Sequence, residues 1–210
     1  AALTTLPLSA QRPARADETL VIRDATVIDG TGAPPRPHTT VFVRNGEIAG
    51  FAVPDGVTPA TTIDAAGRYL MPGLIDAHVH LSGGTFGDAT ATLKKVLAGG
   101  VTTVFDVAGD TRLTGDLARA ALAGEIDAPT IYYSALFGGP EFMKDPRVIG
   151  ASLGYVTGEA PWQRQIDATT DLAAAVAAAP ELVNVTLVTE SLPASPFVVN
   201  SVPANVTASP

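Results

Sequence analysis

The sequence predicts an α/β protein in which strands and helices alternate after a small N-terminal β-sheet. Between Thr19 and Leu70, short runs of alternating apolar residues are separated by turn sequences such as Asp29-Gly30 and Asn45-Gly46. This pattern is typical of a small antiparallel sheet. From residue 69 onward, β-branched runs alternate with amphipathic runs. That order favours a parallel sheet with right-handed crossover connections.

The first three predicted strands cover residues 20–29, 39–51 and 61–70. The Pro-rich segment GAPPRPH, residues 32–38, joins the first two and predicts an exposed loop. His38 ends this segment, and we interpret it as a solvated loop histidine rather than a ligand.

The alternating part begins with a strand over residues 69–80. Amphipathic helices are predicted over 88–100, which ends at two glycines, and over 114–125, with Thr114 as the N-cap. Further strands are expected at 101–109, 128–136 and 182–188, and a third helix at 167–179. The connection from Phe137 to Gln165 is long and rich in Gly and Pro, which is typical of an active-site lid or insertion.

The composition excludes several classes of protein. The formal net charge is -8, and no Lys/Arg run interleaves with aromatic residues, so we expect neither nucleic acid nor an anionic membrane as a partner. Without cysteine there is no disulfide, no thiolate metal site and no Cys nucleophile. No apolar run approaches the roughly 18 residues of a membrane-spanning helix.

The N-terminal residues resemble the back half of a secretory signal. An apolar opening is followed by the sequence Pro-Ala-Arg-Ala, with an expected cleavage position after Ala16. The opening has neither an initiator Met nor a basic segment. Export to the periplasm and a plain disordered N-terminus of a cytoplasmic protein therefore both remain open.

The stretch GLIDAHVH, residues 73–80, holds two of the three histidines. Residues two apart in a strand point to the same face, so His78 and His80 project together and Asp76 shares their side. Two imidazoles at the carboxyl end of a parallel strand can ligate one metal ion. We expect Asp76, one step deeper, to hydrogen-bond to a ligand imidazole. Histidines packed in the strand without metal are the alternative.

The surrounding sequence resembles the metal-dependent amidohydrolase superfamily, in particular its imidazolonepropionase-like and Xaa-Pro-dipeptidase-like branch. PGLIDAHVHL resembles the first barrel strand of that family, and AGGVTTVFDVAGD resembles the second. LVIRDATVIDGTG and VRNGEIAGF resemble strands of its N-terminal β-sandwich. The resemblance covers about residues 20–188.

The resemblance implies the N-terminal part of a (β/α)8 TIM barrel, with about four β/α units, preceded by a small β-sandwich. The expected organisation is a leader or disordered N-terminus (1–18), an incomplete small β-sandwich domain (19–68), half of a hydrolase barrel (69–188) and a Pro/Ser/Thr-rich tail (189–210).

The resemblance also implies one or two divalent metals, usually zinc. The metal would polarise a carbonyl and lower the pKa of a bound water for attack on an amide or another C–N or C–O bond. His78 and His80 match the family's first-strand ligand pair, and Asp106 matches a position near the mouth of the site. For Asp106, a loop-capping or salt-bridged carboxylate is the alternative. Tyr155 and Trp162 are candidates for the wall of a pocket for a small-molecule or peptide-like substrate, or they pack the loop.

The sequence departs from the family pattern after the fourth predicted strand. Asn184 stands where the family has a carboxylated lysine, and no histidine follows His80, so only the N-terminal half of the fold is represented. We therefore expect weak metal binding and no measurable hydrolysis by the isolated chain, read as a fragment of a hydrolase. The alternatives are a non-catalytic half-barrel that assembles with a second copy or another half, and a degenerate relative with structural histidines.

Overall fold

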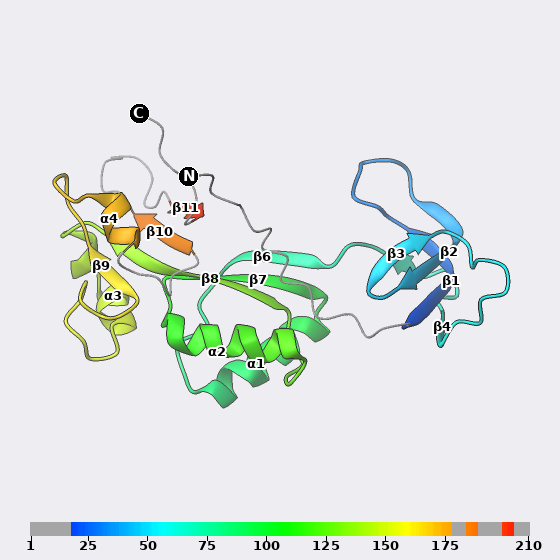
Figure 1. Ribbon diagram of the computed structural model, residues 1–210, viewed down its shortest axis with the longest axis horizontal. Helices are drawn as coiled ribbons and strands as arrows, with labels where there is room; N and C mark the ends of the chain where they lie inside the picture. Colours follow the sequence, from blue (N-terminus) through cyan, green and yellow to red (C-terminus); the bar gives the residue numbers. More distant parts are fainter. Residues whose placement is uncertain (1–17, 178–183, 189–198, 204–210) are drawn as a thin grey trace, which may run out of the picture. The chain divides into compact units, whose positions relative to one another are not determined.

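The computed structural model describes residues 18–177, 184–188 and 199–203 (Figure 1). The chain divides into two compact units, one up to Gly73 and the other from Leu74 onward. Each unit has its own sheet.

The first unit contains five strands in its described residues, and β1 is central. They are β1 (Thr19–Val27), β2 (Arg36–Arg44), β3 (Glu47–Gly50), β4 (Thr61–Asp64) and β5 (Tyr69–Leu70). The pairs β1–β2 and β2–β3 are antiparallel, as predicted. The prediction was wrong for the remaining strands, because β4 and β5 both run parallel to β1. They share one edge of β1: β4 pairs with its first half and β5 with its end.

The predicted turn at Asn45-Gly46 connects β2 to β3. Both residues have positive φ, 53° and 81°, which is the conformation that a two-residue hairpin requires at its two central positions. A small core of Ala25, Val27, Val41 and Ala65 holds the sheet together.

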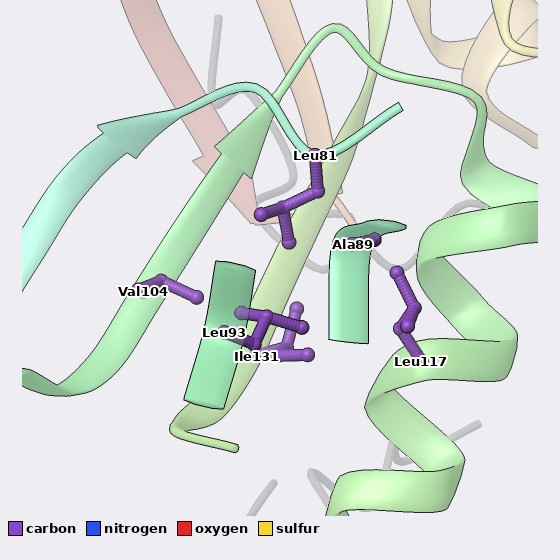
Figure 2. Close-up of a cluster of buried hydrophobic side chains, with 6 residues drawn as sticks. All are labelled: Leu81, Ala89, Leu93, Val104, Leu117 and Ile131. Carbon is purple, nitrogen blue, oxygen red and sulfur yellow. The ribbon is translucent and has the colours of Figure 1, made fainter. Parts of the chain in front are cut away.

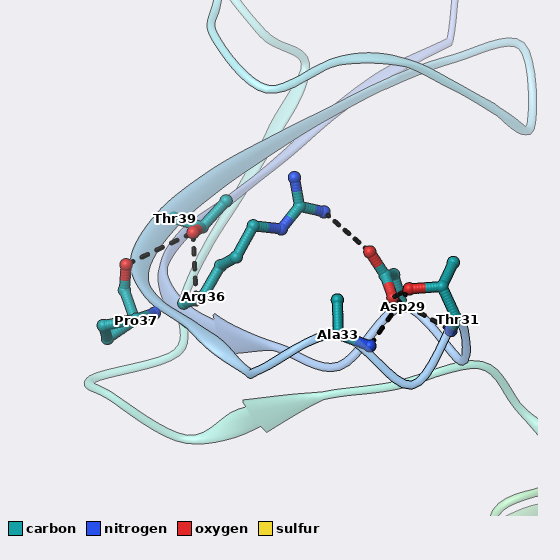
Figure 3. A network of polar contacts seen from close by, with 6 residues as sticks. All are labelled: Asp29, Thr31, Ala33, Arg36, Pro37 and Thr39. Carbon is teal, nitrogen blue, oxygen red and sulfur yellow. Dashed lines mark hydrogen bonds and ion pairs between the residues drawn. The ribbon is translucent and has the colours of Figure 1, made fainter.

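The connection from β1 to β2 is fixed by a polar network (Figure 3). The Asp29 carboxylate accepts hydrogen bonds from the backbone N–H and the hydroxyl of Thr31, at 3.0 and 2.6 Å. The guanidinium of Arg36 lies 3.7 Å from the same carboxylate. His38 is exposed, as expected, but it lies in β2 rather than in the loop, and its Nδ1 is 2.6 Å from Asp24 Oδ1.

The second unit confirms the predicted α/β class with a parallel sheet. Its elements are β6 (Leu74–Val79), α1 (Phe86–Ala98), β7 (Val101–Val107), α2 (Thr111–Ala123), β8 (Thr130–Gly138), the 3-10 helix η1 (Phe142–Lys144), α3 (Pro146–Ala151), β9 (Gln163–Gln165), α4 (Leu172–Ala177), β10 (Asn184–Val188) and β11 (Val199–Pro203). The strand order in the described residues is β11-β10-β8-β7-β6, with β9 also on β8. Every pairing is parallel except that of β10 with β11.

Helices α1 and α2 pack on one face of β6, β7 and β8 (Figure 1). The cluster between these layers consists of six buried side chains, which Figure 2 shows: Leu81, Ala89, Leu93, Val104, Leu117 and Ile131. Val79 packs against the same cluster. Since side chains alternate along a strand, His78 and His80 lie on the opposite face of β6 from the helices.

The two helices begin at strong N-caps. Thr85 and Asp88 form a reciprocal capping box at α1. Helix α2 begins after Asp110, whose side chain accepts from the backbone N–H of Arg112. The prediction of Thr114 as the N-cap was therefore wrong, and Thr114 is a buried residue inside the helix.

The long connection after β8 has structure of its own, because η1, α3 and β9 all lie within it. Helix α4 begins at Leu172, later than predicted, since Asp167 and Thr169 form a turn in which the Thr169 N–H donates to Asp167 Oδ1 at 2.8 Å.

The predicted leader lies outside the described residues apart from Glu18, and most of the predicted tail does also. Residues 199–203 of that tail form β11. Within the described residues, no helix is long and apolar enough to cross a membrane.

Candidate functional site

The two histidines lie together at the carboxyl end of β6. His78 is in the strand and His80 follows its last residue. Their ring centroids are 5.1 Å apart, with the ring planes at 84°. Both side chains are exposed. The sequence pattern thus brought two imidazoles side by side on one face.

The ring of His80 is anchored by the neighbouring strand. Its Nδ1 lies 2.9 Å from the carbonyl oxygen of Val107, the last residue of β7. A carbonyl oxygen carries no proton, so this contact is a hydrogen bond only when Nδ1 is the donor. In the neutral ring, Nε2 then keeps its lone pair, which is the state that a metal ligand needs.

Asp76 contacts the backbone of β6 rather than an imidazole ring. Its Oδ1 accepts from the backbone N–H of His78 at 3.1 Å. Asp76 was expected to bond to an imidazole, and in the structure it bonds to a backbone N–H. The Asp76 carboxylate instead fixes the backbone of β6 where it presents His78.

Asp106 is buried, with 1% of its surface exposed. Its Oδ1 accepts from the backbone N–H of Leu81 at 3.1 Å, and its Oδ2 accepts from the hydroxyl of Thr114 at 2.6 Å. Burial raises the pKa of Asp106, while the hydrogen bonds from Thr114 and Leu81 and the nearby His80 act against that rise. The carboxylate thus ties the residue after His80 to helix α2.

The turn after β7 has a constrained backbone. Ala108 has a φ of 66°, in the left-handed region that residues with a Cβ rarely adopt. At the next position, Gly109, a Cβ would lie 2.6 Å from Asp106 Oδ2 and 2.8 Å from Ser82 Oγ. Only glycine fits there, because the turn passes directly over the carboxylate.

A cavity of about 520 Å³ opens at the carboxyl ends of β6, β7 and β8. His78, His80 and Ser82 lie on one side of it, and the segment 142–153 after β8 supplies another wall. That wall includes apolar side chains and one cation: Phe142, Val148, Ala151, Leu153 and Arg147. The carboxyl ends of parallel strands are where α/β folds build their sites.

Tyr155 and Trp162 are not among the residues that line this cavity. Their rings pack edge to face, with centroids 5.5 Å apart. The guanidinium of Arg112, at the start of α2, lies 4.7 Å from the Trp162 ring centroid. Trp162 is fully buried, whereas Tyr155 is 47% exposed.

The donor set at the cavity fits a metal ion in part. His78 and His80 offer two imidazole nitrogens, which suit zinc. Within the described residues, no group of three His, Cys, Asp or Glu side chains lies close enough together to hold a metal ion.

Comparison with protein families finds one match that spans most of this region. A sequence model described as "Amidohydrolase family" matches residues 61–190, which is more than half of the chain's 210 residues.

Curated relatives match shorter stretches. An enamidase of Eubacterium barkeri is 37% identical over 111 residues, which cover 49% of this chain and 28% of the relative. An adenine deaminase of Rubrobacter xylanophilus is 48% identical over 67 residues, 30% of this chain and 11% of the relative. A D-hydantoinase of Rhizobium radiobacter is 34% identical over 111 residues, 50% of this chain and 22% of the relative. The chain thus spans less than a third of the length of these relatives.

Solved structures share the fold. A Xaa-Pro dipeptidase superposes with a TM-score of 0.61 at 19% identity, covering 83% of this chain and 48% of the other. A molinate hydrolase superposes with a TM-score of 0.50 at 29% identity, covering 58% of this chain and 30% of the other.

Proposed function

Since the chain belongs to the amidohydrolase family, we propose that it carries the first part of the active site of a metal-dependent hydrolase of amide or other C–N bonds. The observation that carries the proposal is the His78–His80 pair at the mouth of the cavity, with the Nδ1 of His80 bonded to Val107. Relatives named enamidase, adenine deaminase and D-hydantoinase support chemistry at C–N bonds. The substrate is a small or peptide-like molecule.

The fold proposal is an N-terminal part of a (β/α)8 barrel, preceded by an incomplete β-sandwich. The parallel run of β6, β7, β8 and β10 supports the barrel, and the sheet around β1 supports the sandwich. In this proposal residues 19–68 belong to the sandwich, 69–188 to the barrel and 189–210 to a tail, with 1–18 as a leader or disordered N-terminus.

His78 and His80 would hold a divalent ion, for which zinc is the best match to two imidazoles. Such an ion supplies Lewis-acid polarisation of the scissile carbonyl. The chain's own contribution is positional: Asp76 fixes the backbone at His78, and Val107 fixes the ring of His80. The wall from Phe142 to Leu153 would cover one side of a substrate bound in the cavity.

Zinc titration of the purified chain tests the metal assignment. We expect weak zinc binding that His78→Ala and His80→Ala each abolish. His38→Ala is the matched control, because His38 lies in the other unit and pairs with Asp24. Zinc binding that survives both site variants would contradict the assignment and favour histidines with a structural role.

Hydrolysis is tested on N-acyl amino acids, hydantoins and dipeptides, with and without zinc. We expect no measurable turnover by the chain alone, since a catalytic zinc site typically needs three protein ligands. Turnover by the monomeric chain that is lost on chelation would show that its own residues complete the site.

A second candidate function is an assembly module, and the exposure of β6 favours it. Leu74 and Ile75 on this strand are 50% and 70% exposed. In this case the native protein in its source cells has the mass of these 210 residues, 21.4 kDa, and forms a stable stoichiometric complex. A native species of roughly twice that mass, detected with an antibody against this region, would favour the hydrolase.

A further inference from the structure

We infer that Asp106 is a positioning residue for His80, acting through the backbone of Leu81 and the end of β7. The inference rests on the proposed function only in naming His80 a metal ligand. It concerns a buried carboxylate that the proposed chemistry itself does not use.

The end of β7 holds His80 at three points. Val79, the residue before it, is in register with Asp106. Leu81, the residue after it, donates its backbone N–H to the Asp106 side chain at 3.1 Å. The imidazole itself donates to the carbonyl of Val107 at 2.9 Å. Backbone and ring are therefore fixed by two consecutive residues of one strand.

The Asp106 side chain and the His80 ring lie on opposite faces of the sheet. Val104 packs in the core under α1 and α2, so Asp106, two residues on, points to the same helical side. His80 lies on the other side, at the cavity. The carboxylate therefore holds the peptide that follows His80 rather than the His80 ring.

Asp106 is itself held in a single place. The buried hydroxyl of Thr114 donates to its Oδ2 at 2.6 Å, and Gly109 covers the same oxygen so closely that no Cβ would fit. Thr114 is 0% exposed. A short, buried hydrogen bond of this kind restricts rotation of the Asp106 side chain.

His78 lacks such a clamp. Its backbone N–H bonds to Asp76, and the described residues offer no hydrogen-bond partner for its ring nitrogens. The two histidines therefore differ: His80 has a set tautomer, and His78 is free to adopt the one that a ligand selects. This difference gives the test an internal reference.

The experiment measures the proton position on each imidazole of the metal-free chain by long-range proton–nitrogen NMR. In the wild type we expect the proton of neutral His80 on Nδ1. In Asp106→Ala, the signal of His80 should move toward a mixture of both tautomers while His78 and His38 stay unchanged. Zinc affinity should fall by about 10- to 100-fold, the usual effect of losing an outer-shell partner.

Asp110→Asn is the matched control. Like Asp106, Asp110 is a buried carboxylate, and it lies at the start of α2. Its hydrogen bonds go to Arg112 and none goes to Leu81. Both substitutions weaken the packing of α2, and only Asp106→Ala should change His80. Thr114→Val, which removes one bond of the carboxylate, should give a smaller shift in the same direction, and Thr114→Ser should restore the wild-type signal.

An unchanged tautomer of His80 in the variants that fold would overturn the inference, even if their stability fell. Thr114→Val decides the matter if Asp106→Ala does not fold. A wild-type chain that binds no zinc yet keeps the set tautomer would refute the metal assignment and leave the positioning role standing. Zinc binding by the wild-type chain, with a His80 tautomer that does not change in the variants, would support the metal assignment and refute the positioning role.

Discussion

Gly109 is tightly packed against the side chains of Asp106 and Ser82. A methyl group at this position would lie 2.6 Å from the Asp106 carboxylate. We expect Gly109→Ala to lower the free energy of unfolding by about 1–3 kcal/mol, the usual cost of inserting a methylene into a packed site. Chemical denaturation measures it.

Gly150→Ala is the matched control for that substitution. A Cβ there would meet no atom within 4 Å, and the residue lies in helix α3. The same change should therefore stabilise, by up to about 1 kcal/mol. Equal effects at the two glycines would show that Asp106 is not tightly enclosed.

Asp145 gives a prediction about pH. It caps α3, and its hydrogen bonds with Arg147 lower its pKa to about 2. A carboxylate whose folded pKa lies below its unfolded value of about 3.9 adds stability above that value and loses it as pH falls toward 2. The difference in unfolding free energy between wild type and Asp145→Asn should therefore shrink as pH falls below about 4.

That comparison is made by urea unfolding at a series of pH values. Asp167→Asn tests the same effect at a turn, because hydrogen bonds from Thr169 also lower the pKa of Asp167. A wild-type advantage that stays constant down to pH 3 would contradict the role of ionised Asp145, since about 3.9 is its unfolded pKa.

At the scale of residues, the sequence was sufficient for the histidine pair and insufficient for its supports. Two-residue spacing on a strand places His78 and His80 on one face wherever the strand lies. The partner of the His80 ring is a backbone carbonyl, and Ala108 adopts its left-handed φ without any residue type that favours it. Such features depend on how β7 ends against β6, which no local pattern encodes.

At the scale of elements, the start of α1 gives the clearest prediction. Thr85 and Asp88 bond each other's backbone N–H groups. We expect Thr85→Ala to cost about 1 kcal/mol of stability, because the first turn loses its cap. Thermal and urea unfolding followed by circular dichroism measure the change.

Thr92→Ala is the control on the same helix. Thr92 is exposed in the helix interior, and its hydroxyl donates to the carbonyl of Asp88 at 3.0 Å. Alanine has the higher helix propensity, so this substitution should be neutral or stabilising by a few tenths of a kcal/mol. A loss of stability as large as that of Thr85→Ala would mean that the capping box contributes no more than a threonine in the helix interior.

The elements also show where sequence patterns mislead. Both Asp110 and Thr114 are residue types that cap helices, and only the tertiary contact decides between them. In the structure the hydroxyl of Thr114 donates to Asp106, and Asp110 is the residue that caps α2. The parallel direction of β4 and β5 is likewise a matter of chain routing, since alternation predicts a strand but not its direction.

At the scale of the molecule, β6 predicts self-association. Within the described residues β6 pairs only with β7, and Ile75 is 70% exposed. An apolar strand with an open edge is a template for pairing. We expect the chain to form dimers or larger species at low micromolar concentration, and Ile75→Lys to shift it toward monomer in sedimentation velocity.

Ile149→Lys provides the comparison, because Ile149 is 52% exposed and lies on helix α3 rather than on a strand. It should leave the association unchanged. A monodisperse wild-type monomer at all accessible concentrations would remove the argument for assembly through β6.

The alternation of strands and helices was enough to predict the parallel sheet, because each buried strand and amphipathic helix has its own period. The pairing of β10 with β11 was not predictable in the same way. Residues 199–203 lie in a Pro-rich stretch without a strand pattern. They pair antiparallel with β10, from Asn184 with Pro203 at one end to Val188 with Val199 at the other.

The short strand β9 decides how the cavity is entered. It pairs with Leu136, Phe137 and Gly138 at the end of β8. This pairing anchors the C-terminal end of the segment that follows β8 to the sheet. To swing outward, that segment would have to break these backbone pairs together with the bond from the Leu136 N–H to the carbonyl of Trp162. Amide hydrogens there should exchange with the slow kinetics of the sheet. We therefore expect this wall of the cavity to stay in place when a ligand enters, so that no opening step of this segment limits the rate of binding.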